Sequence, residues 1–282
     1  MNYGTHEYER RLRALKSKSA KYTSKLFFNI FKAFFVLFLF LAIAGTTIGF
    51  GMVKVIIDSA PSVDLMNIQP DRFATTVYDI GGSLTDTIVT SGSNRESAAY
   101  EELPQDLIDA FVAIEDSRFW SHNGIDIRSI ARAVNGLISD DYAGGGSTIT
   151  QQVVKNTYLT QEQSFTRKIV EILLAPEIEK KYSKADIMEF YCNTNFYGNH
   201  CYGVEAASRY YFGKDASDLE SYEAAVLVGI SNSPTAYNPV RNPEASLKKR
   251  NDVLQSMLEV GYLTEDAYNS AISQPLSIVQ EE

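Results

Sequence analysis

The stretch GGGSTITQQVVKN, at residues 144–156, predicts the start of a helix with one apolar and one polar face. Three glycines lead into Thr148, and Thr148 with Gln151 has the spacing of a capping box, which pairs free backbone N–H groups at a helix N-terminus. At about 100° per residue, Ile149 and Val153 fall on the face that would be buried. The opposite face is a row of hydrogen-bonding groups that ends with a cation and an amide: Gln151, Gln152, Lys155 and Asn156.

Two glutamates, one on each side of this helix in the sequence, are candidates for catalysis. Glu115 follows an apolar run and opens the stretch EDSRFWSHNGID. Glu171 closes RKIVE, in which Arg167 and Lys168 would lie within about one helical turn of it. Taken separately, the first fits a solvated residue at a helix end, and the second fits an exposed ion-pair ladder worth about 0.3–0.5 kcal/mol per pair. Neither glutamate identifies a reaction by itself.

The chain beyond Pro104 reads as a series of helices with short polar connections, so the predicted fold class is mainly α. Pro176 falls inside the helix that carries Glu171, where it removes a backbone donor. The other helix starts and stops are marked by a capping pair, a proline and glycines, namely Ser183 with Asp186, Asn242 with Pro243, Gly213 and Gly261.

The N-terminal region predicts a membrane anchor. Residues 1–32 carry eight Lys or Arg against two Glu, a net of +6 that leaves −15 for the rest of a chain whose formal net charge is −9. Residues 33–53 hold no charge and suffice to cross about 30 Å of hydrocarbon as a helix. The basic flank favours a cytoplasmic N-terminus and an external body. A cleaved signal peptide is the alternative, weakly supported by the small residues Ala42 and Ala44.

The charge and the cysteine count argue against two classes of protein, those that bind nucleic acid and those built on disulfides. The acidic body argues against a nucleic-acid partner, because phosphate backbones are bound by clustered Lys and Arg. Cys192 and Cys201 would lie outside the cell, where disulfides are permitted. Two cysteines in a body of this size do not make a disulfide framework, so we expect two free, partly buried thiols.

Four stretches taken together resemble one known family. They are EDSRFWSHNGID at 115–126, GGSTITQQVVKN at 145–156, RKIVE at 167–171, and the run from KYSKADIMEFYCN to YGVEAASRYYFGK at 181–214. Their order and wording are similar to those of the peptidoglycan glycosyltransferases (glycosyltransferase family 51), found in class A penicillin-binding proteins and in monofunctional transglycosylases. The resemblance covers roughly residues 70–275.

The resemblance implies a bilobal, lysozyme-like, mainly helical glycosyltransferase domain behind a single N-terminal transmembrane helix. With the anchor and strand patterns it predicts a cytoplasmic basic tail at 1–32, a transmembrane anchor at 33–57, an extracytoplasmic stalk with a small β-hairpin at 58–103, and the glycosyltransferase domain at 104–282. A segment at 135–146 is expected to dip into the outer leaflet.

The implied activity is inverting transfer that polymerises lipid II into glycan strands and releases undecaprenyl pyrophosphate. Glu115 would be the general base, and Glu171 its partner near the pyrophosphate. By the same resemblance, the phosphates would be held by Lys155, Arg132, Arg167 and Lys168. The cleft would be lined by Ser147, Thr148, Gln152 and Asn193.

The resemblance also bears on cofactors and partners. A divalent cation, Mg or Mn, at the pyrophosphate is compatible with the family, although no cofactor is required with certainty. The expected partners are lipid II, the growing glycan strand, membrane lipid and other cell-wall synthesis proteins. No nucleic acid is expected.

Two other functions compete with this one. A lytic transglycosylase or lysozyme would share the broad fold and a catalytic glutamate, but it would cleave glycan. Such an enzyme does not need a cation-flanked second glutamate, a lysine on the donor face and a membrane anchor together. A non-catalytic scaffold of wall synthesis is expected to lack Glu115 or Glu171, and both are present.

Overall fold

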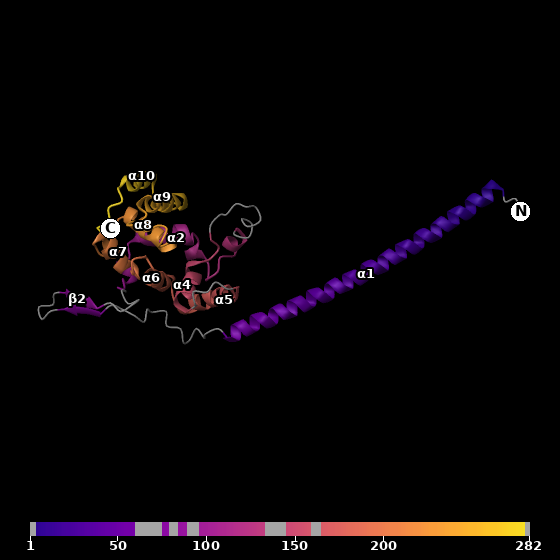
Figure 1. Cartoon of the computed structure of the whole chain (residues 1–282), viewed down its shortest axis with the longest axis horizontal. Coiled ribbons are helices and arrows are strands. Elements are labelled where there is room, and N and C mark those ends of the chain that lie inside the picture. Colours follow the sequence, from indigo (N-terminus) through magenta and orange to yellow (C-terminus); the bar gives the residue numbers. More distant parts are fainter. Residues whose placement is uncertain are drawn as a thin grey trace. The chain divides into compact units, whose positions relative to one another are not determined.

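The computed structural model of the chain describes residues 4–59, 75–78, 84–88, 96–132, 145–158 and 165–279 (Figure 1). The chain divides into two units, Met1–Ser59 and Ala60–Glu282. Most of the segment at 135–146, which the resemblance leads us to expect in the outer leaflet, lies outside the described residues.

The first unit is one continuous helix, α1 (Thr5–Ser59). Its segment Lys25–Gly51 is long and apolar enough to cross a membrane, which fits the predicted anchor. Within this segment, Thr46 and Thr47 donate hydrogen bonds to backbone carbonyls one turn earlier, so their hydroxyls need no water. The basic tail belongs to the same helix, a feature that its charge pattern did not predict.

Two short strands precede the helical part of the second unit. Strand β1 (Thr75–Tyr78) pairs antiparallel with β2 (Leu84–Ile88), and the register places Thr76 opposite Thr87. The pair occurs where the sequence predicts a hairpin. Its use as a stalk stays a prediction.

The rest of the second unit is helical, which confirms the mainly α prediction. Its elements in chain order are η2 (Tyr100–Glu102), α2 (Gln105–Glu115), η3 (Phe119–Ser121), α4 (Ile149–Tyr158), α5 (Phe165–Lys181), α6 (Lys184–Thr194), α7 (Val204–Phe212), η4 (Ala216–Asp218), α8 (Ser221–Asn232), α9 (Pro243–Val260) and α10 (Glu265–Ser273). Residues 127–132 are also helical.

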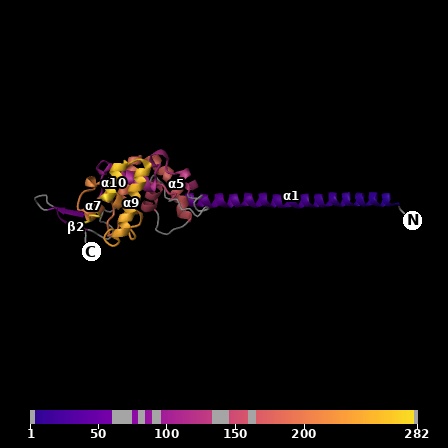
Figure 2. The same cartoon turned by 90° about the horizontal axis from the view of Figure 1, so that it is seen from above.

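Packing joins these helices in two groups. Helix α8 is apolar on nearly all sides, and its residues 223–230 are all buried, as expected for a helix enclosed by others. Helices α2 and α9 pack on α8 and on each other, and α10 lies beside α9 (Figures 1 and 2). Helix α4 packs against α5 and α6. The rings of Phe111 in α2 and Tyr191 in α6 meet edge to face, with centroids 5.0 Å apart, and so connect the two groups.

The predicted helix ends are confirmed. Ser183 accepts from the backbone N–H of Asp186 in a capping box at the start of α6. Pro243 is the first residue of α9. Gly213 and Gly261 end α7 and α9 in the left-handed conformation, which favours glycine.

Gly124 fixes the loop after η3 against helix α5. Its φ is +86°, and a Cβ at this position would stand 2.5 Å from the carbonyl carbon of Ala175 and 2.6 Å from the nitrogen of Pro176, inside α5. Its carbonyl accepts a 2.7 Å hydrogen bond from the hydroxyl of Thr148, next to the start of α4. A glycine is therefore required where the loop touches both helices.

Candidate functional site

A cavity of about 570 Å³ lies in the helical part of the chain. One wall comes from α4, the segment before it, and α5, and the other comes from α8 and α9. Glu115, the last residue of α2, lies between them. The lining residues are Ile114, Glu115, Gly145, Ser147, Gln152, Lys155, Glu171, Ser231, Asn232 and Lys249.

The carboxylate of Glu115 accepts one hydrogen bond on each oxygen. The amide Nε2 of Gln152 lies 2.9 Å from Oε2, and the amide Nδ2 of Asn232 lies 3.1 Å from Oε1. Both donors are neutral, and they come from opposite walls of the cavity. Each carboxylate oxygen keeps further lone-pair capacity, so it can still accept a proton.

A buried tyrosine orients the first of these donors. Tyr191 donates to the amide oxygen of Gln152 over 3.2 Å, which turns the amide nitrogen of Gln152 toward Glu115. Burial raises the pKa of Tyr191 well above its ordinary value, so the hydroxyl keeps its proton. The orientation of Gln152 is thus set by the core.

Glu171 has different surroundings. It is buried, and its two oxygens form ion pairs with Arg167 Nε at 3.1 Å and with Lys168 Nζ at 2.9 Å. Lys168 also donates a 2.6 Å hydrogen bond to Ser147 Oγ in the segment that leads into α4. The pairs that the i,i+3 and i,i+4 spacing predicts are therefore partly buried and tied to the cavity wall, unlike an exposed ladder.

Lys155 supplies a cation between the two glutamates. Burial lowers its pKa from the ordinary 10.5, while the charges of Glu171 and Glu115 act in the opposite direction. Among the described residues, no carboxylate oxygen lies within 4.0 Å of Lys155 Nζ, so Lys155 forms no ion pair with them. A partly buried ammonium that lines a cavity in this way is suited to an anionic ligand.

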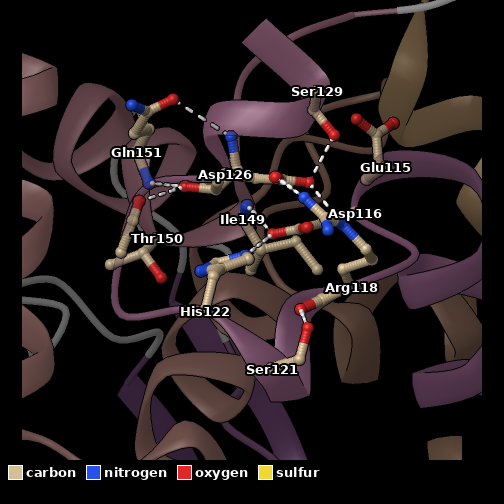
Figure 3. Close-up of polar contacts among 12 residues, drawn as sticks. Glu115, Asp116, Arg118, Ser121, His122, Asp126, Ser129, Ile149, Thr150 and Gln151 are labelled. Atoms are coloured by element: carbon tan, nitrogen blue, oxygen red, sulfur yellow. Dashed lines mark hydrogen bonds and ion pairs between the residues drawn. The ribbon is translucent and has the colours of Figure 1, made fainter. Parts of the chain in front are cut away.

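The residues that follow Glu115 form a supporting network (Figure 3). Asp116 accepts a 3.1 Å hydrogen bond from the backbone N–H of Ile149 at the start of α4 and lies 2.8 Å from His122 Nε2. Asp126 accepts hydrogen bonds from Arg118 and Ser129. Figure 3 shows the carboxylate of Glu115 apart from this network. The stretch at 115–126 therefore supplies one cavity residue and a scaffold that locates it.

Five predicted site residues do not line the cavity, and two of these, Arg167 and Lys168, pair with the lining residue Glu171. The hydroxyl of Thr148 is used by the capping box with Gln151 and by Gly124. The buried amide of Asn193 bonds to both backbone groups of Ala98, at 3.1 and 2.8 Å. Arg132 is exposed and donates to Ser129. For Thr148 and Asn193 the reason is that the hydrogen-bonding capacity is taken up by the fold.

The other predicted site residues lie close together in the fold. Ser147, Gln152, Lys155 and the two glutamates line one cavity. The two remaining cations, Arg167 and Lys168, reach it through Glu171.

Three polar side chains of the lining were not predicted: Ser231, Asn232 and Lys249. They lie far along the chain from Glu115, in helices whose pattern reads as ordinary core. One signal was present, since Gly229 interrupts an apolar helix. A Cβ on Gly229 would stand 3.0 Å from Lys249 Cγ, so the missing side chain makes room for the stem of Lys249.

A divalent cation at the pyrophosphate stays a prediction, because the pyrophosphate itself would supply part of its ligands. No group of three or more His, Cys, Asp or Glu that could hold a metal occurs among the described side chains. Both oxygens of Glu171 are already paired with cations, and Lys155 adds a third positive charge beside it. These charges oppose binding of Mg²⁺ or Mn²⁺ by Glu171.

Both cysteines are free and buried, as the count of two suggested, although they are more deeply enclosed than expected. Burial raises the pKa of Cys201 to about 12 and raises that of Cys192 further. Neither thiol belongs to the cavity.

The chain matches one family model and several curated proteins by sequence. The transglycosylase family model matches residues 81–258. Penicillin-binding protein 1A of Aquifex aeolicus is 43% identical over 225 residues, which is 78% of this chain and 30% of that protein. Penicillin-binding protein 1A of Clostridium perfringens (strain ATCC 13124) is 39% identical over 276 residues, which is 94% of this chain and 33% of that protein. The crystal structure of penicillin-binding protein 1A from Haemophilus influenzae is similar with a TM-score of 0.43 and 22% identity, over 76% of this chain and 22% of that one.

The chain thus spans about a third or less of the length of these curated relatives. The family match itself covers more than half of the present chain and includes both cavity glutamates. The chain therefore belongs to the transglycosylase family, the peptidoglycan glycosyltransferases.

Proposed function

We propose that this chain polymerises lipid II into glycan strands and releases undecaprenyl pyrophosphate, with Glu115 as the general base. The observation that carries the proposal is the cavity in which Glu115, Lys155 and Glu171 meet. The division of its lining into two walls supports the two-lobed, lysozyme-like domain that the resemblance implies. Family membership supports the reaction class.

The surroundings of the two glutamates support different roles for them. Among the described residues, the side chains that donate to Glu115 are neutral amides, so its oxygens can take the proton of an acceptor hydroxyl. Both oxygens of Glu171 are engaged by Arg167 and Lys168. Glu171 is therefore the residue that holds cations in place, and Glu115 is the one suited to act as base.

In the proposed step, the 4-hydroxyl of one lipid II attacks the anomeric carbon of the growing chain and gives its proton to Glu115. The new bond joins the acceptor oxygen to that carbon, and the bond to the pyrophosphate oxygen breaks with inversion. Negative charge develops on the leaving pyrophosphate. Lys155 lines the cavity where this charge would develop, with Arg167 and Lys168 behind it at Glu171.

Membrane attachment is part of the proposal. Lipid II is held in the bilayer, and α1 contains a segment able to span it. The basic residues before this segment favour a cytoplasmic N-terminus, with the cavity outside the cytoplasm. Other cell-wall synthesis proteins are proposed as partners.

Polymerisation of purified lipid II by the full chain in detergent tests the function. Wild type should form glycan strands, and the class inhibitor moenomycin should prevent this. Glu115→Gln should abolish polymerisation, because the amide cannot take the hydroxyl proton. Glu259→Gln, the same substitution at an exposed position of α9, should leave it unchanged. Near-normal turnover by Glu115→Gln would remove the base from the mechanism.

Incubation with purified cell wall separates polymerisation from glycan cleavage. A lytic transglycosylase would release soluble fragments from the wall and would not extend lipid II. A scaffold would do neither. We expect extension of lipid II and no fragments.

A further inference from the structure

We propose that Asn232 is a positioning residue that holds the carboxylate of Glu115 in its reactive orientation. This role presupposes that Glu115 is the general base, as proposed above. Asn232 is the last residue of α8 and lies 117 positions from Glu115 in sequence.

The geometry assigns Asn232 one half of a two-sided clamp. Its Nδ2 lies 3.1 Å from Glu115 Oε1, while Gln152 Nε2 lies 2.9 Å from Oε2. Rotation of a glutamate carboxylate about its last torsion is broad. One donor leaves much of this freedom, whereas donors from opposite walls fix the plane of the carboxylate.

Both halves of the clamp are anchored by the core. Gln152 is held by the buried hydroxyl of Tyr191. Asn232 itself is exposed, but the helix that ends with it is buried throughout residues 223–230. The end of α8 is therefore a rigid platform for an otherwise exposed amide.

The chemical type of the donor matters as much as its place. A neutral amide orients the carboxylate without the full positive charge that Arg167 and Lys168 bring to Glu171. A cation in the place of Asn232 would hold Glu115 more tightly but would make it a weaker base. Because Asn232 is exposed, its removal leaves no buried polar group unpaired, so a purely structural role would be small.

Lipid II polymerisation by full-chain variants Asn232→Ala, Asn232→Gln and Asn232→Asp tests the assignment. Asn232→Ala should lower kcat by about three- to tenfold, the range of an ordinary hydrogen bond, because exposure to water weakens a bond to a charged group; KM should stay within about twofold of wild type. Asn232→Gln keeps a donor on a longer side chain and should recover part of the loss. Asn269→Ala, the same truncation on the exposed face of α10, is the matched control and should match wild type.

The pH profile of kcat distinguishes positioning from structure. The charged and titratable groups that face Glu115 are Lys155 from α4, Glu171 from α5, Tyr191 from α6 and Lys249 from α9, and all are unchanged in these variants. Loss of a donor to the carboxylate should move the acidic limb to higher pH in Asn232→Ala. The added negative charge in Asn232→Asp should move the limb further in the same direction.

The outcomes separate this role from the proposed function. If wild type polymerises and Glu115→Gln does not, but the Asn232 variants keep the wild-type kcat and pH profile, the positioning role is wrong and the function stands. A loss of kcat with an unmoved pH limb and a lowered melting temperature would show a structural role and also overturn the assignment. If wild type fails to polymerise, the proposed function falls and takes this role with it.

Discussion

Lys168 donates a 2.6 Å hydrogen bond to Ser147 and so joins helix α5 to the segment that leads into α4. The same ammonium lies 2.9 Å from Glu171. Because Glu171 is buried and shared with Arg167, the position of Lys168 affects both the wall of the cavity and the charge within it.

Lys168→Ala should therefore destabilise the chain and weaken its activity. We expect a loss of about 1 kcal/mol in the free energy of unfolding, because one cation is removed from a buried carboxylate that keeps the other. The KM for lipid II should rise. The control is Lys180→Ala, since Lys180 and Glu177 form an i,i+3 pair on the same helix but are exposed. Its effect should stay below about 0.5 kcal/mol. Equal effects of the two substitutions in urea denaturation would contradict the prediction.

Gly124→Ala should be more damaging than its backbone conformation alone explains. Gly124 and Gly261 both have strongly positive φ, +86° and +90°. A Cβ on Gly261 would meet nothing within 4 Å, whereas a Cβ on Gly124 would overlap the backbone of α5. Gly261→Ala should cost about 1–2 kcal/mol, and Gly124→Ala should cost more and also reduce activity. Thermal unfolding of both variants measures the difference, and similar melting temperatures would argue against the overlap.

The lowered pKa of Lys155 predicts that activity depends on pH in the alkaline range. Burial lowers the pKa of Lys155, so its ammonium should lose its proton at a pH below the ordinary 10.5. The neutral amine would no longer attract phosphates. Lys155→Arg, which stays charged throughout, should move the alkaline limb of kcat/KM to higher pH. An alkaline limb that does not respond to this substitution would show that another group is responsible.

The lowered pKa of Lys155 also predicts that the free energy of unfolding depends on pH. Since burial favours the neutral amine in the folded chain, the charged Lys155 costs stability at every pH below its lowered pKa. That cost disappears as the pH rises from the lowered pKa to 10.5. Lys155→Met should thus be more stable than wild type at pH 7, and the difference should shrink through this window. Urea denaturation at several pH values checks the sign.

Gly229→Ala should disturb Lys249 rather than the fold. Alanine in a helix interior is favoured over glycine by about 1 kcal/mol, but its Cβ would displace the stem of Lys249. We expect unchanged or higher stability together with a higher KM for lipid II. In a Lys249→Ala background the substitution at Gly229 should have little further effect on KM. Independent, additive effects in this double-mutant cycle would show that Gly229 does not act through Lys249.

The topology can be tested by cysteine labelling in intact cells. A Ser91→Cys variant should react with a membrane-impermeant maleimide, and Ser17→Cys in the basic tail should react only after lysis. The two native thiols should contribute little background, because both are buried and the pKa of Cys201 is raised to about 12. Protection of Ser91→Cys in intact cells would reverse the proposed orientation.

Much of this protein could be predicted from local sequence patterns. The capping box at Thr148 and Gln151, the helix stops at Gly213 and Gly261, and the ion pairs of Glu171 involve residues no more than four positions apart. Such interactions depend on helix geometry, which repeats every few residues and is written directly in residue spacing. The motif order was enough to indicate the family and the two glutamates.

The tertiary structure alone decided which polar side chains face the cavity. Thr148 and Asn193 look like site residues in the sequence, but the fold uses them to hold backbone groups at Gly124 and Ala98. Asn232 looks like an ordinary helix end, yet it bonds to Glu115 from a helix more than a hundred residues away. The sequence determines where each helix begins and which of its faces is apolar. Which polar groups from different helices meet depends on how buried side chains such as Phe111 and Tyr191 pack, and no local spacing encodes that packing.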